Sequence, residues 1–224
     1  PEVEGLDVAA FYATAHRAGG DYYDVFPLSN RRSGILIADV SGHGAAAAVV
    51  MARMHAVLHA QPSVLESPSR TLAFANEQLL QRCRHRDNMV TFVTAFYAVY
   101  DAAARTVTYS SAGHNPPRLH DVDGRICSIA GARQFPLGIE CDVAFDQEQF
   151  PLRQGDEILL YTDGIVEAGN PAGEMFGVDR LDEALLRPHD SARDVVDGIV
   201  RAVDAFADGT PFADDRTILA LRAR

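Results

Sequence analysis

Lysine is absent from this 224-residue sequence, and all 20 basic residues are arginines. We interpret this as a codon bias of the genome, but it excludes chemistry that depends on lysine. The Walker phosphate-binding loop and Schiff-base catalysis both need that side chain. A basic surface is also lacking, since 31 acidic residues give a formal net charge of −11. Because nucleic acids and anionic membranes are bound through basic patches, we expect no nucleic-acid partner and no membrane contact by this domain.

Cysteine is scarce, with three residues, Cys83, Cys127 and Cys141, and no C-x-x-C spacing. This pattern indicates neither a disulfide framework nor a structural zinc site, so we interpret the cysteines as ordinary packing or surface residues. No apolar run reaches the roughly 18 residues that a membrane-spanning helix needs. No signal peptide is visible either. We therefore expect a cytoplasmic protein.

Internal repeats, low-complexity segments and long glycine- or proline-rich breaks are missing as well. The sequence therefore predicts a single domain over residues 1–224, and the apolar fraction of 47% can form a sizeable core. The chain begins at Pro1 rather than at a methionine. We expect it to be the C-terminal output domain of a longer sensor protein.

Apolar and polar residues alternate or cluster in a definite order along the chain. Helices are predicted in two pairs, at 45–60 and 69–86 and at 178–187 and 192–206, with Ser69 and Ser191 as caps. Strands are predicted at 6–14, 25–29, 34–40, 90–101, 105–113, within 115–129 as a hairpin turning at Asp123-Gly124, 142–152, 156–163 and 216–222. Because helices do not alternate with strands, a doubly wound parallel sheet is disfavoured. The order predicts an α+β fold of packed antiparallel sheets covered by helices.

Aspartates stand at four places at or near the ends of these predicted strands. Asp39 and Asp163 each end an apolar strand and are followed by a glycine within three residues, and Asp21 follows two glycines. Asp214 and Asp215 directly precede the last strand. One such residue alone is most simply a turn or cap residue. Four together favour a common site, because aspartate is poor inside strands and a partly buried acid needs a partner.

Carboxylates that converge in one pocket repel one another and raise each other's pKa. No lysine is available to relieve that repulsion, whereas two divalent cations would balance four negative charges. Ligation by oxygen alone suits hard ions such as Mg²⁺ or Mn²⁺. Two such ions, about 4 Å apart, can activate a bridging water for in-line attack on phosphorus.

The ordered stretches GGDYYDVFPL, ADVSGHG, FVTAFYAVYD, SAGHNPP, PLGI, GDEILLYTDGIVEA, FGVDRL and DDRTILALR run from residue 19 to residue 222, within a resemblance that extends over about residues 6–221. Together they resemble the metal-dependent protein phosphatase (PPM) family, in its bacterial SpoIIE/RsbU-like branch. The resemblance implies a four-layer αββα sandwich of two antiparallel sheets flanked by helices. It also implies that two Mn²⁺ or Mg²⁺ ions bind at one end of this sandwich.

The same resemblance implies which residues hold the ions. The metal ligands are Asp21, Asp39, the backbone carbonyl of Val40, Asp163 and Asp214, with Asp215 as the alternative to Asp214. Asp21, Asp39, Asp163 and Asp214 are catalytic through the bridging water. Asp24 is a candidate to support the ligands, and a solvated loop acid is the equal alternative.

Some residues near these motifs keep two interpretations. His43 is a possible general acid, but it is shifted two positions from the D-G-H sequence of eukaryotic relatives, and a helix-start or packing role fits equally well. Arg17 lies near the place of a phosphate-binding arginine of those relatives. A water bound to metal is the alternative proton donor.

Other histidines carry less weight in the sequence. His55 and His59 are one helical turn apart and could face one metal ion, but no acid lies between them as in H-E-x-x-H. We favour a helix-surface or packing role for this pair. His114-Asn115 precedes two prolines, and we favour a turn held by the asparagine side chain over a role in shaping the site.

The resemblance implies a protein serine/threonine phosphatase whose substrate is a phosphorylated STAS-type anti-sigma-factor antagonist. It also implies regulation by an N-terminal sensor in cis, often through a homodimer, with the two helices over 45–86 as the switch. Two alternatives belong to other classes. One is a phosphatase fold that only scaffolds a partner. The other is a dinucleotide-binding loop at Gly42, Gly44 and Ala47, which would place Asp39 against an anionic pyrophosphate.

Overall fold

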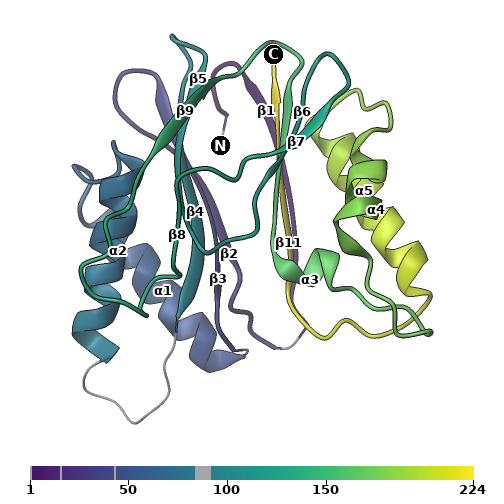
Figure 1. Ribbon diagram of the computed structural model, residues 1–224, viewed down its shortest axis with the longest axis horizontal. Helices are drawn as coiled ribbons and strands as arrows, with labels where there is room; N and C mark the ends of the chain where they lie inside the picture. The colour runs from purple at the N-terminus through teal and green to yellow at the C-terminus, as the bar shows by residue number, and fades with distance from the viewer. Residues whose placement is uncertain (1, 16, 43, 84–91) are drawn as a thin grey trace. The chain divides into compact units, whose positions relative to one another are not determined.

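The computed structural model describes residues 2–15, 17–42, 44–83 and 92–224. The chain forms two compact units, each with its own sheet and its own helices (Figure 1). The first unit comprises Arg17–His114 and Ala130–Leu152. The second comprises Glu2–His16, Asn115–Ile129 and Arg153–Arg224.

The sheet of the first unit has the strand order β2-β3-β4-β5-β8, and β9 also pairs with β5. Its neighbours are antiparallel except for β8, which runs parallel to β5. The strands are β2 (Tyr22–Pro27), β3 (Arg32–Val40), β4 (Val93–Asp101), β5 (Thr106–Ala112), β8 (Arg133–Gln134) and β9 (Glu148–Pro151). Because β3 and β4 are antiparallel, the intervening helices do not form a dinucleotide-binding βαβ unit. The dinucleotide-loop alternative is therefore wrong.

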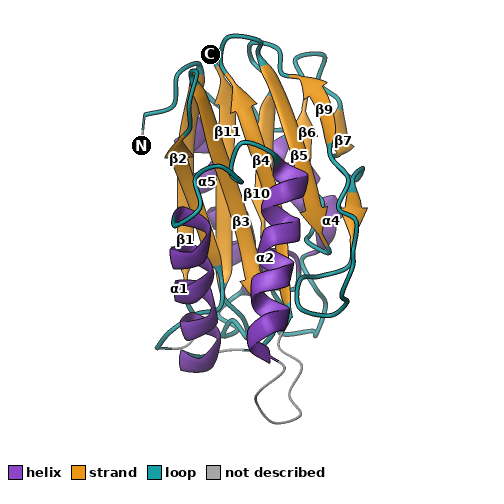
Figure 2. Ribbon diagram, turned by 90° about the vertical axis from the view of Figure 1, so that its left-hand side faces the viewer, coloured by secondary structure: helices purple, strands orange, loops and turns teal. Residues whose placement is uncertain are grey.

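Helices α1 (Ala45–His59) and α2 (Pro68–Cys83) lie side by side on one face of this sheet (Figure 2). Alanine and methionine favour the α1 helix, and its buried residues recur at helical spacing. They are Ala47, Met51, Met54 and Leu58. Alternate residues of β3 and β4 complete the core beneath them: Leu36, Ala38, Val40, Ala95, Tyr97 and Val99. The tertiary packing of α1 thus ties it to the strand that carries Asp39.

The sheet of the second unit has the order β1-β11-β10-β6-β7 and is antiparallel throughout. The strands are β1 (Leu6–Ala13), β11 (Arg216–Ala223), β10 (Glu157–Tyr161), β6 (Arg118–His120) and β7 (Ile126–Ser128). Helices α4 (Gly177–Leu185) and α5 (Ala192–Ala207) cover it, and a one-turn helix α3 (Asp163–Val166) follows β10. The Ser191 hydroxyl accepts a hydrogen bond from the Asp194 amide, as its predicted capping role requires.

The predicted α+β class is confirmed, since two largely antiparallel sheets are each flanked by helices. Two local predictions were wrong, and one strand was missed. The strand predicted at 25–29 begins earlier, at Tyr22, and α2 begins at Pro68 with Ser69 inside its first turn. Strand β8 was not predicted. Proline suits the first turn of a helix because its missing amide would have no partner there. The predicted end of this helix, residues 84–86, lies outside the described residues.

Within the described residues, none of the helices has both the length and the apolarity that crossing a membrane requires.

Candidate metal centre

Two of the predicted ligands lie at the same end of the β2–β3 ladder in the first unit. Tyr22 pairs with Ala38, so continuing the register by one step places Asp21 opposite Asp39. Asp21 is 7% exposed, whereas Asp39 is half-buried. The antiparallel hairpin thus brings together two acids that are well separated along the chain.

The Val40 carbonyl is held beside Gly20. The Val40 amide donates a hydrogen bond of 3.3 Å to the Gly20 carbonyl, which ties the two segments together. A Cβ atom at position 20 would lie 3.0 Å from the Val40 oxygen and 3.1 Å from the Ala47 Cβ. Both contacts would be tighter than ordinary van der Waals contacts, so glycine favours this close approach. The arrangement supports Val40 as the residue that offers its carbonyl.

The loop after β3 turns sharply before α1 begins. Gly42 and Gly44 have φ values of +94° and +79°, which side chains with a Cβ rarely adopt. Ser41 pins the loop to the sheet, because its hydroxyl accepts a bond of 3.0 Å from the Phe92 amide. His43, the possible general acid, lies outside the described residues.

Sequence reasoning missed a pair of polar residues beside Asp39. Thr94 is the partner of Asp39 on β4, and its hydroxyl lies 2.9 Å from Nδ1 of His114. His114 is only 1% exposed. The preferred interpretation of His114-Asn115 as a turn held by Asn115 therefore overlooked a buried histidine that contacts the neighbour of Asp39. In the sequence, only the S-A-G-H-N-P-P motif, which contains His114, could have indicated this role.

The other predicted ligands lie in the second unit. Contrary to the prediction, Asp163 does not end a strand: β10 ends at Tyr161, Thr162 is the N-cap, and Asp163 opens helix α3. The Thr162 hydroxyl accepts a bond of 3.0 Å from the Thr217 amide, which ties this turn to β11. Asp163 is consequently half-buried beside the start of β11.

Asp214 and Asp215 differ in environment. Asp215 is 3% exposed, and its carboxylate accepts a bond of 2.9 Å from the Ala15 amide. Asp214 is exposed, and its carboxylate accepts a bond of 2.8 Å from the Asp215 amide. Each carboxylate thus accepts one backbone hydrogen bond, and the two acids differ in that Asp215 is buried whereas Asp214 is exposed.

The electrostatics connect Asp163 with Asp214. Burial raises the pKa of the Asp163 carboxyl above its usual value, and the nearby charges of Asp214 and Glu167 raise it further. A divalent cation would relieve this cost, because it favours the ionised form of both acids. The four acids are thus distributed as Asp21 and Asp39 in one unit and Asp163 and Asp214 in the other.

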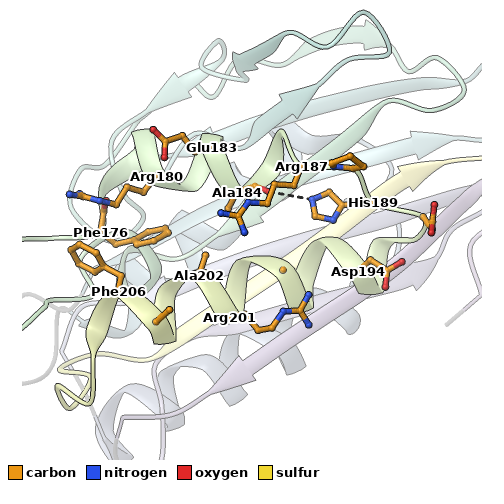
Figure 3. Close-up of a pocket in the computed structure, with 14 residues that line it drawn as sticks. Phe176, Arg180, Glu183, Ala184, Arg187, His189, Asp194, Arg201, Ala202 and Phe206 are labelled. Atoms are coloured by element: carbon orange, nitrogen blue, oxygen red, sulfur yellow. Dashed lines mark hydrogen bonds between the residues drawn. The ribbon is translucent and has the colours of Figure 1, made fainter.

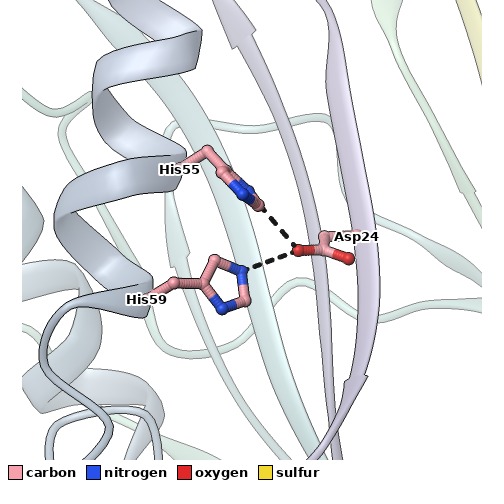
Figure 4. A group of neighbouring side chains, drawn as sticks. All are labelled: Asp24, His55 and His59. Carbon is pink, nitrogen blue, oxygen red and sulfur yellow. Dashed lines mark hydrogen bonds and ion pairs between the residues drawn. The ribbon is translucent and has the colours of Figure 1, made fainter.

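Asp24 lies in strand β2 rather than in a loop, so its interpretation as a solvated loop acid is wrong. Its carboxylate accepts a bond of 2.7 Å from the Tyr22 hydroxyl and lies 2.8 Å from Nε2 of His59. His55 approaches the same carboxylate (Figure 4). Arg17 is exposed in the segment that precedes β2.

A pocket of about 740 Å³ lies between α4 and α5 in the second unit (Figure 3). Arginines 180, 187 and 201 and the rings of Phe176 and Phe206 line it, and His189 contacts the Ala184 carbonyl at 3.3 Å. None of the predicted metal ligands is among its lining residues. The pocket is therefore separate from the candidate metal centre.

The family model described as "Stage II sporulation protein E (SpoIIE)" matches residues 29–224. The chain belongs to the SpoIIE family. The matched range includes Asp39, Asp163 and Asp214, while Asp21 precedes it. The predicted SpoIIE/RsbU-like family is thereby confirmed.

Two relatives of this SpoIIE-family chain match it over its whole length. It is 30% identical over 226 residues to "Phosphoserine phosphatase RsbU" of Bacillus subtilis (strain 168), covering 100% of the chain but 65% of that protein. The crystal structure of the RsbU and RsbW domains of Rv1364c from Mycobacterium tuberculosis matches with a TM-score of 0.83 and 27% identity. That match covers 100% of this chain and 63% of the other. The chain thus spans less than two thirds of both.

A more distant structure extends the likeness in fold. The catalytic domain of the serine threonine protein phosphatase PstP, solved in complex with two manganese ions, has a TM-score of 0.69 and 17% identity. The match covers 97% of each chain. The SpoIIE-family chain therefore has the fold of a PP2C-type phosphatase.

Proposed function

We propose that this SpoIIE-family domain is a metal-dependent protein serine/threonine phosphatase that hydrolyses phosphoserine or phosphothreonine on a regulatory protein. The observation that carries the proposal is the presence of Asp39, Asp163 and Asp214 within the 29–224 family match. The likeness to RsbU, which is named a phosphoserine phosphatase, supports the same conclusion.

The donor set fits hard divalent cations. We propose that Asp21, Asp39, the Val40 carbonyl, Asp163 and Asp214 hold two Mn²⁺ or Mg²⁺ ions. All five donors are oxygens, which suits these ions. The raised pKa of Asp163 beside Asp214 supports the assignment, since it marks a repulsion that a cation would relieve. The two manganese ions of PstP support the number.

The ions, when bound, supply a nucleophilic water near neutral pH and stabilise charge at phosphorus. The chain's own residues orient the donors. Close contact with Gly20 aims the Val40 carbonyl, and the bond from the Ala15 amide to Asp215 holds the segment that carries Asp214. His43 remains the proposed general acid, with a bound water as the alternative proton donor.

We propose a phosphorylated STAS-type anti-sigma-factor antagonist as the substrate. The family resemblance points to this class, and the phosphoserine named for RsbU agrees with it. A scaffold without catalysis is the alternative, and the presence of all four predicted acids argues against it.

The experiment is to measure phosphate release from a phosphoserine peptide and from a phosphorylated STAS protein, with Mn²⁺, Mg²⁺ or a chelator. We expect release only when one of the two ions is present, and faster release from the STAS protein. Equal release from peptide and protein would reject the substrate class alone. No release under any condition would favour the scaffold.

We further propose that α1 and α2 act as a regulatory switch governed by an N-terminal sensor, through a homodimer. Support comes from their position, because α1 follows the Asp39–Val40 segment after a short loop and packs on the strand that carries it. In a longer protein that includes the sensor, we expect the signal to change both the phosphatase rate and the molecular mass measured by light scattering. Rates that are independent of the signal would contradict this regulation.

A further inference from the structure

Strand β2 and helix α1 together place three metal-binding side chains around one point (Figure 4). Asp24 projects from β2, while His55 and His59 lie one turn apart on α1. One ligand atom from each residue lies within 4.8 Å of the other two. The sequence offered only the i, i+4 histidines, and the strand supplies the acid that the helix lacks.

The separations are close to those of a mononuclear metal site. Nε2 of His59 lies 2.8 Å from Oδ2 of Asp24, and Nδ1 of His55 lies 3.7 Å from the same oxygen. Zinc bonds to nitrogen and oxygen are about 2.0–2.2 Å long, so ligand atoms on one ion are about 3–4 Å apart. The two distances to Asp24 Oδ2 are therefore close to the spacing of ligands on one ion, and all three ligand atoms lie within 4.8 Å of one another.

The burial of the three side chains suits an open site. The side chain of His55 is 50% exposed, that of His59 34% and that of Asp24 23%. An ion can enter from solvent, and water can complete the coordination. The Tyr22 hydroxyl donates a bond of 2.7 Å to Asp24 Oδ2 and lies 2.5 Å from His55 Nδ1, so a bound ion would take over its contact with His55 Nδ1.

We propose that Asp24, His55 and His59 bind a divalent transition-metal ion of the Zn²⁺ class, which fastens α1 to β2. Two imidazoles and one carboxylate match the preference of Zn²⁺ and differ from the all-oxygen set proposed for Mn²⁺ or Mg²⁺. No acidic residue lies between the two histidines as in H-E-x-x-H, so no neighbouring general base is supplied. The role is to hold the helix in place.

The test is a Zn²⁺ titration by calorimetry in the Asp39→Asn background, which removes a ligand of the proposed phosphatase centre. We expect one Zn²⁺ to bind per chain and to raise the melting temperature. Adding His59→Gln should weaken binding at least about tenfold, which is the loss that even an outer-shell partner of a metal typically causes. Co²⁺ should give a visible d–d absorption band that the added substitution abolishes.

Two further variants test whether the loss of Zn²⁺ binding is specific to the proposed ligands or follows from removing any histidine. His55→Gln should reproduce the loss of Zn²⁺ binding, and its half-exposed position leaves the fold intact. His120→Gln is the matched control, because His120 also lies beside a carboxylate, 3.2 Å from Oε2 of Glu157, but without a second histidine. It should leave Zn²⁺ affinity unchanged. Equal Zn²⁺ affinity with and without His59→Gln overturns the proposal, whatever the fate of the phosphatase activity.

Discussion

Replacing Asp163 by asparagine is expected to remove metal-dependent phosphate release while leaving the metal-free protein at least as stable as the wild type. The substitution keeps the shape of the side chain but removes the charge that would hold a cation. Loss of a residue that only supports a metal ligand typically lowers activity by about 10- to 100-fold. Because Asp163 is proposed as a direct ligand, we expect the rate of phosphate release to fall at least about a hundredfold. Phosphate release with Mn²⁺ measures the first effect, and thermal unfolding with a chelator measures the second.

The expected gain in stability follows from the raised pKa of Asp163. The folded chain retains a proton there at pH values at which the unfolded chain has lost it, so stability falls as the pH rises above the ordinary value of 3.8. Asparagine does not titrate and avoids this cost at neutral pH. Because Asp214 is exposed and water screens its charge, we expect a gain of up to about 1 kcal/mol. The gain should vanish at acidic pH, where Asp163 is protonated in both states.

Asp101→Asn is the matched control for activity, because Asp101 is the last residue of β4 and lies opposite Arg32 in the ladder, at the other end of the β3–β4 ladder from Asp39. It should leave phosphate release unchanged, whereas Asp39→Asn should behave as Asp163→Asn does. Wild-type, metal-dependent activity in Asp39→Asn or Asp163→Asn would show that the assigned centre is wrong. A large loss of stability in Asp163→Asn would contradict the electrostatic interpretation.

Replacing Gly164 by alanine is expected to be among the most destabilising single changes in the second unit. An added Cβ would overlap the Asp215 carbonyl oxygen and would lie 2.9 Å from its carbonyl carbon. These are backbone atoms, so relief requires α3 to move away from β11. Alanine favours a helix by about 1 kcal/mol over glycine, but overpacking of this severity costs about 3 kcal/mol or more. The net effect should lower the melting temperature by at least about 4–8 °C in a chain of this size.

Gly169→Ala provides the comparison, because an added Cβ there would meet nothing nearer than the Glu174 carbonyl oxygen at 3.9 Å. Its stability should remain within about 0.5 kcal/mol of the wild type. Both variants are compared by thermal unfolding with and without Mn²⁺. If Gly164→Ala melts with the wild type, the contact between α3 and the Asp214–Asp215 segment is not as tight as described. We also expect Gly164→Ala to lose phosphate release, because Asp163 and Asp214 would separate.

The sequence predicted most helices and the longer strands because each carries its signal within a short window. The apolar run in 34–40 and the helical spacing in 45–60 are properties of neighbouring residues, and they correspond closely to β3 and α1. The shorter elements were less predictable. A two-residue strand such as β8 has no period to detect, and it forms only because β5 lies beside it.

The sequence by itself determined the family and the identity of the candidate ligands, because these depend on which residues follow one another in ordered motifs. The backbone roles of the glycine before Asp21 and of the glycines after Asp39 could also be inferred from the sequence. A close approach or a positive φ is a property of the local backbone.

Only the tertiary structure decided which distant residues meet. The pairing of β2 with β3 places Asp21 opposite Asp39, and the close approach of Gly164 to the Asp215 carbonyl sets α3 against the segment before β11. In the same way, the acid of β2 joins the two histidines of α1 only because that helix packs on the strand face that bears it. These contacts join residues from different elements, so they depend on how the elements pack and are not encoded in any local pattern.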